Sequence, residues 1–254
     1  MIDFQKEVID RSFEMPIVVD FWAPWCGPCR ILGPVIEQIS TEQEGQWALV
    51  KLNTEEQEEI SHQYGIRSIP NVKMFYRGEV IDEFTGALPR QMILEWLKKG
   101  LPKPGLIALD QLLAEHANPE ATAVESLLER YPDSPEIRIV LSQLILWDQP
   151  AKVIEILEPV KMGTPYYDKA SHLREIASFL CMSVDDAEIM EIQDLIKGGH
   201  LHEVLPKIIT TLGKNPKVAD GQLAKAAIGI FQTLGTQHEL TKAYRKQLDM
   251  VLWA

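Results

Sequence analysis

The chain has 254 residues, of which 46% are hydrophobic and 24% are charged, the composition of an ordinary globular protein. At this length we expect two hydrophobic cores of modest size. The formal net charge of -12 argues against binding to nucleic acid or to an anionic membrane surface, because both need clustered lysines and arginines.

Neither a secretory signal nor a membrane span is expected. Residues 1–5 contain no basic stretch, and the first apolar run, residues 16–22, is short and contains Asp20. No run approaches the ~18 apolar residues that a membrane helix needs. Three cysteines are too few for a framework of structural disulfides. We therefore expect a cytoplasmic protein that makes no membrane contact.

The first hundred residues alternate between helix and strand patterns. We predict a helix over 4–12, a strand over 17–22, a helix over 29–43, a strand over 47–52, a helix over 55–64, a strand hairpin over 72–76 and 80–85, and a helix over 89–100. This order indicates an α/β domain with a mixed sheet flanked by helices.

Residues 101–105 contain two prolines and a glycine, which stop the preceding helix and mark a boundary. We therefore predict one domain over 1–103 and a second over 104–254. Beyond the boundary, apolar residues recur at helical spacing, as in residues 223–234, and no strand pattern is evident. These helices are typical of a small α-solenoid built from degenerate tetratricopeptide-like (TPR-like) repeats, although no strict period of about 34 residues aligns.

The main chemical motif is Trp25-Cys26-Gly27-Pro28-Cys29, which follows a strand and opens a helix. At a helix N-terminus, unpaired N–H groups and the helix dipole stabilise a thiolate, and the thiolate is the species that attacks disulfides. Cys29 lies about one turn after Cys26, close enough to resolve a mixed disulfide. The pair predicts thiol–disulfide exchange, with Cys26 attacking and Cys29 resolving.

Zinc binding is the alternative reading of a Cys-x-x-Cys pair, because half of a zinc site has the same spacing. A structural zinc site needs two further nitrogen or sulfur ligands, and only Cys181 and six histidines remain. None of the histidines forms a Cys-His spacing with Cys181, so we expect no metal. Cys181 falls on the apolar stripe of residues 173–180, which predicts a buried, inert thiol.

Residues 4–100 resemble the thioredoxin family, through the active-site motif, the strand that precedes it and the Ile69-Pro70 dipeptide. The resemblance implies a thioredoxin fold and a redox-active Cys26–Cys29 disulfide with no other cofactor. It also implies that Asp20 and Lys51 are buried together beneath the cysteines and relay the proton of the resolving thiol. The strand ahead of the first helix in usual members is expected to be absent here, leaving the 47–52 strand exposed or covered by the helical tail.

The same resemblance implies a groove that binds an extended protein substrate beside the cysteines. Its residues would be Trp25, Gly27, Pro28, Ser68, Ile69, Pro70 and Gly86. Pro70 would be the family's cis-proline and Gly86 its groove glycine. Asn71 stands where many members have threonine, a difference that could tune substrate choice.

The whole chain resembles the bacterial chaperedoxins, the YbbN-type proteins, in which a thioredoxin domain precedes tetratricopeptide-like helices. The C-terminal residues that carry this resemblance include Asp220-Gly221, Leu234-Gly235 and residues 244–248. It implies a protein-disulfide reductase whose helical domain binds clients or a chaperonin, and which thioredoxin reductase recharges. The alternative is a holdase or co-chaperone adaptor in which redox chemistry is secondary.

Overall fold

The structure is a computed structural model that describes residues 2–253. The chain forms two compact units, of which the first ends at Glu115 and the second begins at His116. The predicted boundary at residues 103/104 falls in the short connection between helices α3 (Arg90–Gly100) and α4 (Pro104–Glu115).

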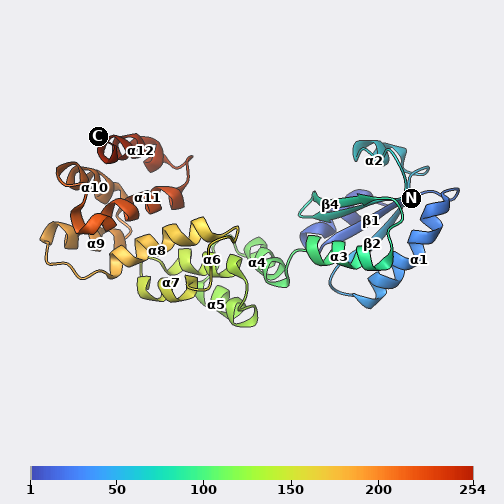
Figure 1. Cartoon of the computed structure of the whole chain (residues 1–254), viewed down its shortest axis with the longest axis horizontal. Coiled ribbons are helices and arrows are strands. Elements are labelled where there is room, and N and C mark those ends of the chain that lie inside the picture. Colours follow the sequence, from blue (N-terminus) through green and yellow to red (C-terminus); the bar gives the residue numbers. More distant parts are fainter. Residues whose placement is uncertain (1, 254) are drawn as a thin grey trace. The chain divides into compact units, whose positions relative to one another are not determined.

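The first unit contains a four-stranded mixed sheet (Figure 1). Its strands are β1 (Ile17–Trp22), β2 (Ala48–Asn53), β3 (Asn71–Tyr76) and β4 (Glu79–Thr85), in the order β2-β1-β3-β4. β1 is parallel to β2 and antiparallel to β3, and β4 is antiparallel to β3. The predicted α/β class is confirmed, and β2 forms an edge of the sheet within the described residues.

Helices cover both faces of this sheet because its central strands are apolar on both sides. On one face, α1 (Gly27–Glu42) and α3 pack on a core that includes Val18, Val72 and Met74. On the other, the π-helical segment η1 (Gln5–Asp10), the 3₁₀ turn η2 (Arg11–Phe13) and α2 (Glu58–Gln63) lie over a core that includes Val19 and Phe75.

Side chains along β1 and β2 alternate between the two faces of the sheet, and this alternation determines which residues α1 covers. Val18 and Asp20 point to the α1 face, whereas Val19 and Phe21 point to the opposite face. Lys51 is the partner of Asp20 in the β1–β2 register. Asp20 and Lys51 therefore share the face of the sheet on which α1 lies.

The helix predicted over 55–64 begins later than expected, at Glu58. The Asn53 side-chain oxygen accepts a hydrogen bond from the Glu55 backbone N–H at 3.1 Å, and its carbonyl accepts from the N–H of Gln57 at 3.1 Å. These bonds form an asparagine turn that competes with helix formation. The acidic residues 55 and 56 consequently lie in a turn near the C-terminal end of β1, the end that leads to the two cysteines.

Helix α4 is part of the first unit and is bonded to its sheet region. The Asp110 carboxylate accepts from the Tyr76 hydroxyl at 2.7 Å and pairs with the Arg77 guanidinium at 2.9 Å. The Gln111 side chain donates to the Glu14 carbonyl at 3.0 Å. Three bonds to three segments fix the orientation of this helix on the sheet domain.

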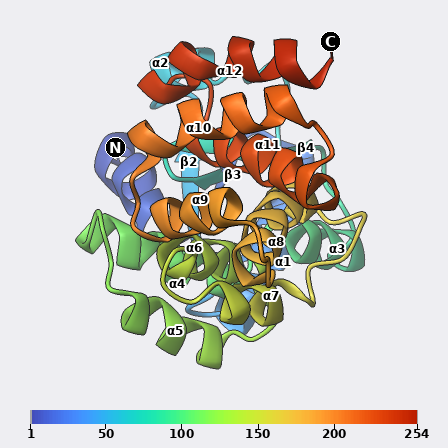
Figure 2. The same cartoon turned by 90° about the vertical axis from the view of Figure 1, so that its left-hand side faces the viewer.

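The second unit consists of helices joined by short turns within its described residues. They are α5 (Ala121–Arg130), α6 (Pro135–Ile145), α7 (Pro150–Leu157), α8 (Tyr167–Cys181), α9 (Ala187–Lys197), α10 (Leu201–Lys214), the 3₁₀ turn η3 (Val218–Gly221), α11 (Gln222–Leu234) and α12 (Glu239–Leu252). Helix α8 packs on α7 and α11, and α10 packs on α9 and α12 (Figure 2). This arrangement confirms the predicted all-helical second part.

Close helix packing in this unit depends on Gly229. A Cβ at this position would lie 2.9 Å from the His172 carbonyl oxygen and 3.0 Å from an Ile176 side-chain carbon. Cβ atoms essentially never lie as close as 2.9 Å to a backbone oxygen, so a side chain at this position would force α11 away from α8.

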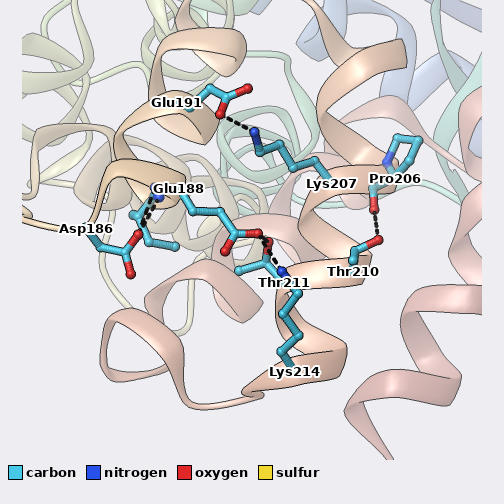
Figure 3. Close-up of polar contacts among 9 residues, drawn as sticks. Asp186, Glu188, Glu191, Pro206, Lys207, Thr210, Thr211 and Lys214 are labelled. Carbon is cyan, nitrogen blue, oxygen red and sulfur yellow. Dashed lines mark hydrogen bonds and ion pairs between the residues drawn. The ribbon is translucent and has the colours of Figure 1, made fainter.

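Polar contacts join α9 to α10 (Figure 3). Asp186 caps α9 by accepting from the N–H groups of Glu188 at 2.8 Å and Ile189 at 3.2 Å. Glu188 in turn accepts from the Thr211 hydroxyl at 2.7 Å and from the Lys214 ammonium at 3.3 Å, and Lys207 pairs with Glu191. A helix cap and its adjacent ion pairs therefore fix this helical hairpin.

The prediction that Cys181 is buried is wrong, because its side chain is exposed and unpaired. Leu173, Ile176, Ala177 and Leu180 form the buried face of α8. Cys181 lies four residues after Ala177, on the same side of the helix, but it is the last residue of α8, and the chain leaves the helix at Met182.

Candidate active site

The two cysteines of the motif lie where β1 leads into α1. Cys26 is the N-cap of α1, its φ and ψ are extended, and Pro28 occupies the first turn. Cys26 and Cys29 form a disulfide with Cα atoms 5.3 Å apart. The Cys29 backbone N–H lies 3.1 Å from the Cys26 sulfur. The same N–H can stabilise a thiolate on Cys26 when the pair is reduced.

A small apolar cluster surrounds the disulfide. Cys26 and Cys29 are 3% and 5% exposed, and they pack with Ala23, Trp22 and Ile69. Among the described residues, no group of three or more His, Cys, Asp and Glu side chains is placed to hold a metal. The site is therefore a sulfur pair that is almost entirely shielded from solvent.

The carboxyl group of Asp20 is the buried titratable group beneath α1. It is fully buried, and neither of its oxygens has a hydrogen-bond partner among the described residues. Burial raises the pKa of Asp20 to about 6, with Lys51 lowering that pKa and Glu37 raising it. A carboxyl group that titrates near neutral pH is suited to accept and release a proton.

The expectation that Lys51 is buried with Asp20 is wrong. The Lys51 side chain is 35% exposed, and its ammonium pairs with the Glu37 carboxylate at 2.6 Å. The same ammonium lies 5.2 Å from the centre of the Trp22 ring. Since β2 is an edge strand, the long lysine stem carries the charge out to solvent while its base stays on the α1 face.

Trp25 forms the exposed rim of the site. It is 66% exposed, and its indole N–H donates to the Glu55 carboxylate at 2.8 Å. The helix predicted over residues 55–64 would have begun at Glu55. The asparagine turn instead places Glu55 so that its carboxylate holds the indole.

The remaining predicted groove residues come from three segments. Gly27 and Pro28 begin α1, and Pro28 and Ser68 are exposed. The Ile69-Pro70 peptide bond is cis, and Ile69 packs against the disulfide cluster. Gly86 has a φ of +94°, and its N–H donates to the Pro70 carbonyl at 2.8 Å. The start of β3 and the end of β4 therefore lie side by side.

Asn71, which follows Pro70, is buried, and its amide donates to the Thr85 hydroxyl at 2.9 Å. Its oxygen has no partner among the described residues. This side chain therefore links β3 to β4, and its place inside the sheet rather than on the rim weakens a direct role in substrate choice.

Glu37 is a functional candidate that sequence reasoning missed. Cys29, Gly33 and Glu37 are spaced by four residues, so they lie along one side of α1. That spacing was the available signal. The contact itself joins residues 14 apart in sequence and depends on how α1 crosses β2.

Comparisons with known proteins give separate matches for the first unit and for part of the second. The sequence model of the thioredoxin family matches residues 2–99, and a tetratricopeptide repeat model matches residues 185–253. Thioredoxin 1 of Nostoc sp. is 45% identical over 98 residues, covering 39% of this chain and 90% of the relative. The thioredoxins of Synechocystis sp. and Chlorobaculum thiosulfatiphilum are 47% and 50% identical, with 39% and 36% of this chain and 90% and 82% of each relative covered. 

Proposed function

This chain belongs to the thioredoxin family and carries a tetratricopeptide repeat region, and on that premise we propose that it reduces disulfides in client proteins held by its helical part. It is a thioredoxin-type disulfide reductase. The observation that carries the proposal is the position of Cys26, capping α1 with the Cys29 N–H on its sulfur.

In the proposed reaction, the Cys26 thiolate attacks one sulfur of a client disulfide. The client S–S bond breaks, a mixed disulfide forms, and one client thiolate leaves. Cys29 then loses its proton and attacks the Cys26 sulfur, which releases the second client thiolate and forms the Cys26–Cys29 disulfide. Two electrons pass from the cysteine pair to the client, and a dithiol reductase, thioredoxin reductase in our proposal, returns them.

Asp20 is the proposed acceptor of the Cys29 proton. Its pKa of about 6 lets the carboxyl exist in both protonation states near neutral pH. The exposed rim of Trp25, together with Gly27, Pro28, Ser68, Ile69, Pro70 and Gly86, is the proposed docking groove for an extended client segment. We assign no cofactor beyond the cysteine pair.

The helical part is the proposed client or chaperonin-binding part, as in the chaperedoxins that the chain resembles. The match to a tetratricopeptide repeat over residues 185–253 supports this proposal. Large apolar side chains stand exposed on this unit: Met162 is 79% exposed, Met190 49% and Trp253 85%. We propose these three side chains as contacts for unfolded client segments.

We place this activity in the reducing cytosol, where an exposed free thiol such as Cys181 persists. No helix in residues 2–253 is both long and apolar enough to cross a bilayer.

Two assays on the full chain test the two functions separately. The wild type should reduce a model protein disulfide under conditions in which a thioredoxin succeeds, and the Cys26→Ser/Cys29→Ser variant should not. Failure of the wild type would overturn the reductase proposal. Suppression of client aggregation that is undiminished in the double variant would favour the alternative, a holdase or co-chaperone adaptor with secondary redox chemistry.

A further inference from the structure

The buried carboxyl of Asp20 lacks the partner that its strand register offers. Asp20 and Lys51 are register partners on adjacent strands and share the face beneath α1. Asp20 is fully buried with both oxygens unpartnered. An ammonium on the next strand is the natural counter-ion for such a carboxylate, so its engagement elsewhere requires a cause.

A carboxylate on α1 competes with Asp20 for this ammonium. Glu37 lies on the same side of α1 as Cys29, and its Oε1 is 2.6 Å from the Lys51 ammonium. Gly33, one turn closer to Cys29, lies beside this ammonium, and a Cβ there would be in ordinary van der Waals contact with Lys51 Nζ at 3.5 Å. The flexible side chain of Lys51 can therefore reach either the Glu37 or the Asp20 carboxylate.

The other charged groups near this site have their own partners. Glu56 lines a pocket of about 250 Å³ together with Lys51 and Trp22, and its carboxylate accepts from the Asn53 amide at 3.0 Å. Arg30 on α1 donates to the Pro24 carbonyl at 3.0 Å. The charges acting on Asp20 are therefore Lys51 from β2 and Glu37 from α1.

We propose that Glu37 is a positioning residue that holds Lys51 away from Asp20 and thereby keeps the Asp20 carboxyl able to take a proton at neutral pH. An ion pair this exposed is weak, so Glu37 biases the lysine without immobilising it. This inference deepens the proposed function and rests on Asp20 as the acceptor of the Cys29 proton.

Removing the Glu37 charge should lower the pKa of Asp20 for two reasons. Repulsion between the two carboxylates disappears, and Lys51 becomes free to pair with Asp20. An opposite charge at close range lowers a carboxyl pKa by about 1–3 units. For Glu37→Gln we expect a downward shift on the order of one pH unit, which changes the protonated fraction near neutral pH about tenfold.

The test is a ¹³C NMR titration of the Asp20 carboxyl in the full-length reduced protein, with disulfide reduction rates over the same pH range. The matched control is Glu42→Gln, which removes the same charge from the same helix but from a residue that pairs with Arg90. Glu37→Asp keeps the charge and should restore much of the wild-type titration. In a Lys51→Gln background, Glu37→Gln should shift the pKa of Asp20 far less.

An Asp20 titration in Glu37→Gln that coincides with wild type and with Glu42→Gln would overturn the proposal. An equally large shift in the Lys51→Gln background would also overturn it, because the lysine would then play no part. If the Asp20 pKa falls as expected but the rate profile does not follow, Glu37 positions Lys51 as proposed, and the proton-accepting role of Asp20 is wrong.

Discussion

Replacing Asp20 with Asn should stabilise the folded first unit at neutral pH. The pKa of Asp20 is about 6 in the folded chain against an ordinary 3.8, because burial disfavours the charged form. An Asn side chain resembles the neutral carboxyl in shape, and both oxygens already lack partners among the described residues. The substitution therefore removes the cost of ionisation without breaking a hydrogen bond.

The way in which this stability difference changes with pH follows from the raised pKa of Asp20. Below about pH 4 the carboxyl is neutral in both the folded and unfolded chain, so it adds no cost. Between about pH 4 and pH 6 the unfolded chain loses this proton while the folded chain keeps it, so stability falls as pH rises. Above about pH 6 the cost is constant. At about 1.4 kcal/mol per pKa unit, it reaches about 3 kcal/mol.

Urea unfolding at several pH values between 4 and 8, followed by tryptophan fluorescence, measures this difference. Four of the six tryptophans, at positions 22, 25, 47 and 96, lie in the first unit. Glu44→Gln is the control, since it removes the charge of an exposed carboxylate. A gain for Asp20→Asn that is the same at pH 4 and pH 8, or no gain at pH 8, would refute the reasoning.

Three further substitutions test packing, capping and the rim. Gly229→Ala should destabilise the helical unit by about 1–2 kcal/mol in thermal unfolding, because the clash with α8 outweighs a helix-propensity gain of about 1 kcal/mol. The control is Gly213→Ala, at an exposed helical position, which should stabilise the same unit. Asp186→Ala should cost about 1 kcal/mol and speed hydrogen exchange in the first turn of α9, with Asp185→Ala as control. Glu55→Ala should raise KM for a protein disulfide and change stability by less than about 0.5 kcal/mol, since the indole it holds is exposed.

Local patterns predicted most of the first unit. The apolar run at residues 17–22 became the central strand β1, and the prolines and glycine after residue 100 ended α3 where expected. The placement of Cys26 at a helix start followed from the same local logic, because strand, turn and helix signals succeed one another within a few residues. Such signals depend only on residues that are close together in the sequence, so they can be recognised without the fold.

The wrong predictions share a different cause, because each depends on distant side chains or on where a helix begins or ends. Lys51 chooses Glu37 over Asp20 only once α1 lies across β2. Glu55 contacts Trp25 only because Asn53 delays the start of α2. Cys181 is exposed at the last position of α8, and the apolar spacing does not show where that helix ends.

The central claim is that Cys26 attacks and Cys29 resolves, and single-cysteine variants test it most directly. Full-length Cys29→Ala and Cys26→Ala are each mixed with a model disulfide peptide and examined under non-reducing conditions by mass spectrometry. We predict that Cys29→Ala accumulates a stable mixed disulfide through Cys26 and that Cys26→Ala forms little. Equal or faster capture through Cys29 would contradict the assignment, because the thiol capping α1 would then not be the nucleophile.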